Sequence, residues 1–121
     1  MRQTKNLKTE IRPWGQFFII QESENYKIKR IEILPNHRLS YQYHQKRSEV
    51  WVIIKGHGKI TIDGKVQDYK IGDTIRIPKY AKHRIQSGNT ETVFIEIQTG
   101  EYFGEDDIVR IEDDYNRLNE K

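Results

Sequence analysis

Short runs of alternating apolar and polar residues fill most of this 121-residue chain, and they leave few folds open to it other than an all-β one. The runs recur about every 8–12 residues with Gly, Pro, Asn or Asp between them, which is typical of a β-sandwich or a β-barrel. In chain order they read WGQFFIIQ, YKIKRIEIL, LSYQYH, VWVIIKG, GKITID, KVQDYKI, TIRIP, HRIQS and TVFIEIQ.

The segments between and after these runs give further local predictions. Asp63-Gly64 is the strongest hairpin signal, because a two-residue type I′ turn needs positive φ at both positions. Asn36, after Pro35, suits a left-handed turn position. The alternation of YKIKRIEIL changes phase at Lys29–Ile31, which predicts a β-bulge there. The acidic stretch EDDIVRIEDDYNRLNEK is predicted to be helical or irregular.

The length predicts one domain, residues 1–121, with a barrel core at about 12–100 and an acidic C-terminal segment at 101–121. No cysteine is present, which excludes disulfides and thiolate metal ligands. No apolar run approaches the length of a membrane span, so no membrane partner is expected. The basic N-terminus lacks the apolar region of a secretory signal, and a cytoplasmic location is therefore expected.

The net charge of +3 divides unevenly, with +8 in residues 1–100 and −5 in residues 101–121. A basic body can indicate nucleic-acid binding. Here, however, the Lys and Arg residues are scattered singly along the alternating runs, and no nucleic-acid motif is present. A solvated strand face, or a small basic pocket for a phosphorylated metabolite, is the better interpretation.

A set of possible metal ligands lies around the stretch YQYHQKRSEVW. Gln42 and His44 share one face of a strand because side chains alternate, and Glu49 opens the next run. These three side chains can converge on one point, and His83 is the candidate for a fourth ligand. The set offers two imidazoles, one carboxylate and one amide, which suit Zn, Mn, Fe, Co or Ni without choosing among them.

The spacing of these residues resembles the two cupin motifs, G-x5-H-x-H-x4-E-x6-G and G-x5-P-x-G-x2-H-x3-N. The fixed places of the first motif are taken by Asn36, Gln42, His44, Glu49 and Gly56, and those of the second by Gly72, Pro78, Tyr80, His83 and Ser87. Four of these places depart from the motifs in identity: Asn36, Gln42, Tyr80 and Ser87. The four metal positions of the motifs nonetheless all hold a residue that can ligate through nitrogen or oxygen.

Several longer segments narrow the resemblance. RPWG, YKIKRIEILP, LSYQYHQKRSEVW and GEYFGEDDIVRIEDDY occur in this order and resemble the cupin domain of type II phosphomannose isomerases, over about residues 10–118. In many members that domain follows a mannose-1-phosphate guanylyltransferase part, which is not seen in this sequence. The resemblance implies a single cupin barrel in which Gln42, His44, Glu49 and His83 hold one divalent metal ion, with Arg47 as a catalytic residue.

Other residues are candidates for substrate contacts. Lys46, Lys29 and Arg12 can contact a phosphate, as can Arg84, because lysine and arginine donate charge-assisted hydrogen bonds to phosphate oxygens. Glu96 shares strand parity with Phe94 and Gln98 and is therefore expected to face the barrel interior. Where family members often carry histidine, this chain has Gln45, Lys46 and Val50.

The leading prediction is a metal-dependent isomerase of a phosphorylated hexose, converting mannose 6-phosphate to fructose 6-phosphate. One alternative is a non-catalytic sugar-binding cupin that serves with a separate guanylyltransferase chain in GDP-mannose or polysaccharide synthesis. Another is a nucleotide-sugar epimerase or ketoisomerase that needs no metal. A homodimer is expected in each case, since small cupins commonly pair through sheet edges.

Overall fold

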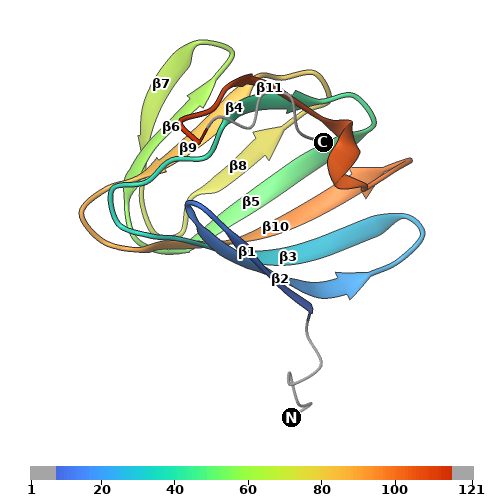
Figure 1. Ribbon diagram of the computed structural model, residues 1–121, viewed down its shortest axis with the longest axis horizontal. Coiled ribbons are helices and arrows are strands. Elements are labelled where there is room, and N and C mark those ends of the chain that lie inside the picture. The colour runs from blue at the N-terminus through green and yellow to red at the C-terminus, as the bar shows by residue number, and fades with distance from the viewer. Residues whose placement is uncertain (1–7, 116–121) are drawn as a thin grey trace.

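A computed structural model describes residues 8–115, which form two antiparallel β-sheets facing each other (Figure 1). The six-stranded sheet has the order β1-β2-β3-β10-β5-β8, and the five-stranded sheet has the order β11-β4-β9-β6-β7. The predicted all-β cupin fold is confirmed. The strands are β1 (Lys8–Arg12), β2 (Gly15–Glu22), β3 (Tyr26–Ile33), β4 (Tyr41–His44), β5 (Arg47–Lys55), β6 (Gly58–Ile62), β7 (Lys65–Tyr69), β8 (Thr74–Ile77), β9 (His83–Ser87), β10 (Thr92–Gly100) and β11 (Ile108–Glu112), with a 3-10 turn, η1 (Glu105–Asp107), before β11.

The space between the sheets changes from apolar to polar along the strands. In one row across the six-stranded sheet, Phe94 lies between Ile31 and Ile53, and all three are buried. Two residues further along β10, Glu96 lies between Lys29 and Trp51. In the row after that, the buried Gln98 lies between Lys27 and Glu49. The apolar rows form the core, and the polar rows place charged side chains inside the barrel.

The predicted bulge at Lys29–Ile31 is wrong. β3 alternates without interruption from Tyr26 to Ile33, and Lys27 and Lys29 point inward in the same parity as Ile31. The apparent change of phase arises because inward positions at the polar end of the barrel carry lysine instead of isoleucine. The irregularity of this sheet region lies in the neighbouring strand β2, between Ile19 and Gln21.

The prediction for the acidic C-terminal stretch is only partly right. Glu105–Asp107 form the single turn η1, but Ile108–Glu112 form β11, which pairs with β4. Ile108 lies opposite His44, and Arg110 lies opposite Gln42. β11 thus becomes the edge strand and covers β4, which would otherwise be an exposed edge, and local sequence preference does not reveal this pairing. Residues 116–121 of the stretch lie outside the described part of the chain.

Two turn predictions are confirmed. Ile62 and Lys65 pair across a two-residue turn in which Asp63 has φ 48° and Gly64 has φ 83°. Asn36 has φ 58°, in the left-handed region. Between residues 8 and 115, no helix has the length and apolar character that crossing a membrane would require.

The rows of the core lead to a stability prediction. Phe94 is 0% exposed and packs its ring 4.5 Å from that of Trp51, whereas Ile54 is 42% exposed on the outer face of the neighbouring strand β5. Truncating a buried phenylalanine leaves a cavity, so we expect Phe94→Ala to lower the free energy of unfolding by about 3–5 kcal/mol. Urea titration measures this change. Ile54→Ala is the control, and equal losses in the two variants would contradict the packing described here.

Candidate functional site

Three buried side chains from three strands meet inside the barrel. His44 ends β4, Glu49 lies in β5 and His83 begins β9. One ligating atom from each residue lies within 4.8 Å of the other two. Their exposed fractions are 2%, 1% and 2%. The structure therefore brings together three of the four residues predicted to hold a metal, although His83 lies far from the other two along the chain.

Both histidines are neutral and one presents a free lone pair. His83 Nδ1 lies 2.9 Å from the carbonyl oxygen of Ala81, so this nitrogen carries the proton and donates it. Nε2 is then the unprotonated nitrogen, and it is buried without a hydrogen-bond partner in the described part of the chain. Burial lowers the pKa of His83, and it lowers the pKa of His44 to about 4 against the opposing charge of Glu49. Neutral imidazoles are the form that binds metals.

Glu49 is held from two sides by hydrogen bonds. Its Oε1 accepts a hydrogen bond from Trp51 Nε1 at 2.9 Å, and its Oε2 accepts one from Arg47 Nε at 2.9 Å. Oε2 also lies 3.2 Å from His44 Nε2. Burial alone would raise the pKa of Glu49, but the groups around it, with the charge of Arg47 first, outweigh burial and lower the pKa well below the usual range. The carboxylate is therefore ionised although it is fully buried.

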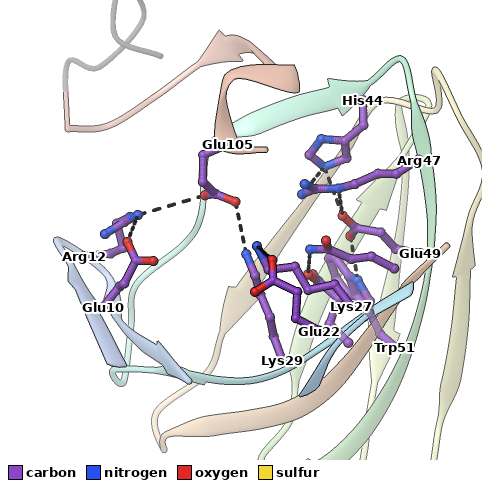
Figure 2. A network of polar contacts seen from close by, with 12 residues as sticks. Glu10, Arg12, Glu22, Lys27, Lys29, His44, Arg47, Glu49, Trp51 and Glu105 are labelled. Carbon is purple, nitrogen blue, oxygen red and sulfur yellow. Dashed lines mark hydrogen bonds and ion pairs between the residues drawn. The ribbon is translucent and has the colours of Figure 1, made fainter. Parts of the chain in front are cut away.

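Arg47 places a second buried charge beside the histidine–glutamate cluster (Figure 2). Its Nη2 lies 3.4 Å from His44 Nε2, and its side chain is 3% exposed. Nη1 is buried and has no hydrogen-bond partner among the described residues. A cation therefore already neutralises Glu49, while one end of the guanidinium remains available to a further acceptor.

The fourth predicted ligand, Gln42, lies directly opposite His83 in the pairing of β4 with β9. It is half-buried, and its Oε1 accepts a hydrogen bond from Ser40 Oγ at 2.6 Å. Gln42 and Arg47 line the same cavity of about 50 Å³. Two neutral imidazoles, an ionised carboxylate and an adjacent amide fit a divalent transition-metal ion, and the free lone pair of His83 favours the same interpretation.

The outer part of this cavity is basic. Lys29 is 4% exposed; its Nζ lies 4.1 Å from the ring centroid of Phe17 and 3.1 Å from Glu105 Oε2. The guanidinium carbon of Arg12 lies 5.0 Å from the same ring centroid. Arg12 Nη2 is 2.9 Å from Glu10 Oε1 and 4.0 Å from Glu105 Oε1. Two of the predicted phosphate contacts, Lys29 and Arg12, thus line the same cavity and both lie near Phe17 and Glu105.

Glu96 faces the interior, in the parity predicted for it. Gln98 Nε2 donates a hydrogen bond to Glu96 Oε2 at 2.6 Å. Burial, together with the nearby charge of Glu49, raises the pKa of Glu96 to about 8, although Lys29 and Arg47 oppose the shift. Glu96 therefore tends to hold a proton at neutral pH and adds little negative charge to the cavity.

Two predicted contacts lie elsewhere. Lys46 is exposed, with its Nζ 5.2 Å from the ring centroid of Tyr102, and it does not line the cavity. Arg84 donates to the carbonyl oxygen of Leu39 and forms an ion pair with Glu112 at 3.2 Å. Glu105 and Trp51 were not identified from the sequence. Strand parity with Glu49 points to Trp51, whereas nothing near Glu105 in the sequence indicates that it reaches the cavity.

The sequence of the chain matches a family described as mannose-6-phosphate isomerase C-terminal over residues 1–113. It is 41% identical over 107 residues to a mannose-1-phosphate guanylyltransferase of Salmonella montevideo, which covers 88% of this chain and 23% of the relative. The corresponding protein of Escherichia coli strain K12 is 39% identical over 108 residues, 88% of this chain and 23% of the relative. The chain therefore spans less than a quarter of these relatives.

Solved structures support the fold alone. Oxalate decarboxylase from Bacillus subtilis has a TM-score of 0.77 at 21% identity and covers 88% of this chain and 30% of its own. A cupin-2 domain protein from Rhodospirillum rubrum has a TM-score of 0.73 at 13% identity, with 88% and 82% coverage. Another structure of the Bacillus subtilis decarboxylase is described as having Mn(II) centres.

The relatives correct the predicted activity. Conversion of mannose 6-phosphate to fructose 6-phosphate was the leading prediction, but the curated relatives at about 40% identity are named as guanylyltransferases and not as isomerases. The catalytic role predicted for Arg47 belonged to that reaction, and in the structure its guanidinium holds the Glu49 carboxylate. The alternative of a cupin associated with GDP-mannose synthesis agrees better with these names. The chain belongs to the family described as mannose-6-phosphate isomerase C-terminal, a cupin domain found in mannose-1-phosphate guanylyltransferases.

Proposed function

We propose that this chain is a sugar-phosphate-binding cupin that serves GDP-mannose synthesis together with a mannose-1-phosphate guanylyltransferase, without isomerising the sugar itself. The observation that carries the proposal is the buried His44, Glu49 and His83 cluster beneath a basic cavity, in a chain 41% identical to part of a guanylyltransferase. The proposed partner is the guanylyltransferase, either as part of the same polypeptide or as a separate chain. Homodimer formation and a cytoplasmic location stay predictions.

His44, Glu49 and His83 would hold one divalent ion, with Gln42 as the neighbouring fourth ligand. When bound, such an ion supplies a positive centre that attracts sugar hydroxyl oxygens. The residues around it prepare the site: Trp51 and Arg47 orient the Glu49 carboxylate, and Ala81 fixes the His83 ring through its carbonyl oxygen. Fixing ligands through further hydrogen bonds is typical of metal sites.

Lys29 and Arg12 would bind the phosphate group of the sugar, since both reach the cavity and charge-assisted hydrogen bonds to phosphate are strong. The unpaired Nη1 of Arg47 is a third donor nearby. Trp14 and Phe17 supply apolar surface to the same cavity, which suits the C–H faces of a sugar ring. The site thus combines a metal centre, an anion-binding rim and an apolar wall.

Replacing a proposed ligand should weaken metal binding. We expect His83→Gln to weaken the affinity for Mn²⁺ or Zn²⁺ by about 100-fold, because the free lone pair at Nε2 is lost. Isothermal titration calorimetry of the purified chain measures the affinity. His57→Gln is the matched control, because His57 is not one of the three clustered residues. Unchanged metal affinity in His83→Gln would contradict the proposed ligand set.

The anion-binding rim should discriminate mannose 1-phosphate from mannose. We expect Lys29→Met to weaken mannose 1-phosphate binding at least about tenfold, because it removes a buried cation and leaves the apolar stem. Calorimetry in the presence of Mn²⁺ measures this. Lys59→Met is the control, since the Lys59 side chain is 61% exposed and pairs with Asp68. No detectable binding of mannose 1-phosphate by the unmodified chain would overturn the proposed function.

A further inference from the structure

The Glu105 side chain extends toward Lys29 and Arg12 and contacts both (Figure 2). It lies on the turn η1, between β10 and β11, and contributes to the cavity lining. Its two carboxylate oxygens are directed to different cations: Oε2 lies 3.1 Å from Lys29 Nζ, and Oε1 lies 4.0 Å from Arg12 Nη2. A carboxylate placed in this way occupies the position where a phosphate group would meet the same two cations.

The charge balance explains why a carboxylate is needed there. Arg12 has Glu10 as a partner, and Arg47 has Glu49. Lys29 is buried and forms its ion pair with Glu105. Leaving a buried ammonium without a counter-charge costs several kcal/mol. Glu105 therefore compensates Lys29 while no other anion is present.

The charge state of Glu105 fits this role. Burial alone would raise its pKa, but Lys29, then Arg47 and Arg12, outweigh burial and lower the pKa below the usual value. An ionised carboxylate and an incoming phosphate group repel each other and need the same donors. The two cannot occupy the position together.

The size of the cavity also indicates that Glu105 and a sugar phosphate cannot occupy it together. Its volume is about 50 Å³, whereas pockets for small-molecule ligands hold roughly 300–1,000 Å³. The cavity is therefore too small for a whole hexose phosphate, and any side chain that borders solvent and turns outward enlarges it. The Glu105 side chain is 33% exposed, so it borders solvent and can turn outward. Lys29 and Arg47 are each less than 5% exposed, so their side chains cannot turn outward into solvent in the same way.

The turn that carries Glu105 is itself anchored. Asp107 is 7% exposed, and its carboxylate accepts hydrogen bonds from the backbone N–H groups of Gln45 at 3.2 Å and Lys46 at 3.0 Å. These two residues connect β4 to β5, the strands that carry His44 and Glu49. The anchor keeps η1 in place, so the movement needed for ligand entry is a rotation of the Glu105 side chain.

We propose that Glu105 is an internal competitor for a phosphate-binding position formed by Lys29 and Arg12, and that a phosphate monoester enters by displacing its carboxylate. The proposal rests on the proposed sugar-phosphate function and names its regulation. Glu105 forms an ion pair with Lys29 when no phosphate group is bound, and this competition sets the affinity of the position for phosphate. A ligand then binds only in the fraction of molecules whose Glu105 side chain has turned away.

The test compares binding of mannose 1-phosphate by the unmodified chain and by Glu105→Gln, using calorimetry with Mn²⁺ present. Glutamine keeps the shape and an oxygen acceptor for Lys29 but removes the competing charge. We expect the dissociation constant to fall about tenfold, because the competitor no longer limits the open fraction. Glu101→Gln is the matched control: it removes one exposed negative charge nearby and should leave the affinity unchanged.

The unfolding temperature of Glu105→Gln, measured with and without mannose 1-phosphate, tests the proposal even if the variant is less stable. We expect Glu105→Gln to unfold at a lower temperature than the unmodified chain without ligand, and to gain more in unfolding temperature from added mannose 1-phosphate. If the unmodified chain binds the ligand and Glu105→Gln binds it no more tightly, the competitor role is overturned while the proposed function stands. If neither protein binds mannose 1-phosphate, both proposals fall.

Discussion

The buried carboxylate of Glu49 is the constraint around which this end of the barrel is organised. A charge with 1% exposure is tolerated only where partners surround it, and Arg47, Trp51 and His44 supply them. These contacts join β4 to β5, and the clustered ligand atom of His83 brings in β9. The same arrangement leaves two neutral imidazoles beside an ionised carboxylate. The electrostatics that stabilise the fold therefore also prepare a place for a cation.

Burying charged side chains at one end of the barrel costs free energy, and the burial of apolar side chains in the neighbouring rows offsets this cost. Phe94, Ile31 and Ile53 fill the space between the sheets at one level, and burying such side chains contributes about 1.5–3 kcal/mol each. Two residues along each strand, the inward positions carry Lys29 and Glu96 instead. A barrel of this size accommodates charges in its interior because each has a counter-charge, a hydrogen bond or a proton. The cavity and the cluster of His44, Glu49 and His83 lie at this polar end.

The sequence allowed the fold and the clustering of His44, Glu49 and His83 to be predicted, but not the contacts of Glu105 at the cavity. Alternation identified most strands, and motif spacing placed His83 with His44 and Glu49 although it is distant from them in the sequence. The inward parity of Lys29 was missed because a buried lysine resembles a surface residue until its partner is known. That partner, Glu105, is 76 positions away in an acidic segment without alternation. The activity was predicted wrongly, because resemblance to a family does not fix which reaction one domain performs.

Anomalous X-ray scattering from a crystal of the chain soaked in Mn²⁺ tests most directly whether these side chains share one ion. The expected result is a single strong peak about 2.0–2.3 Å from His83 Nε2, His44 Nε2 and a Glu49 oxygen, with the Gln42 amide adjacent. A peak elsewhere, or no peak at these residues while Arg47 still covers Glu49, would contradict a metal centre in this barrel.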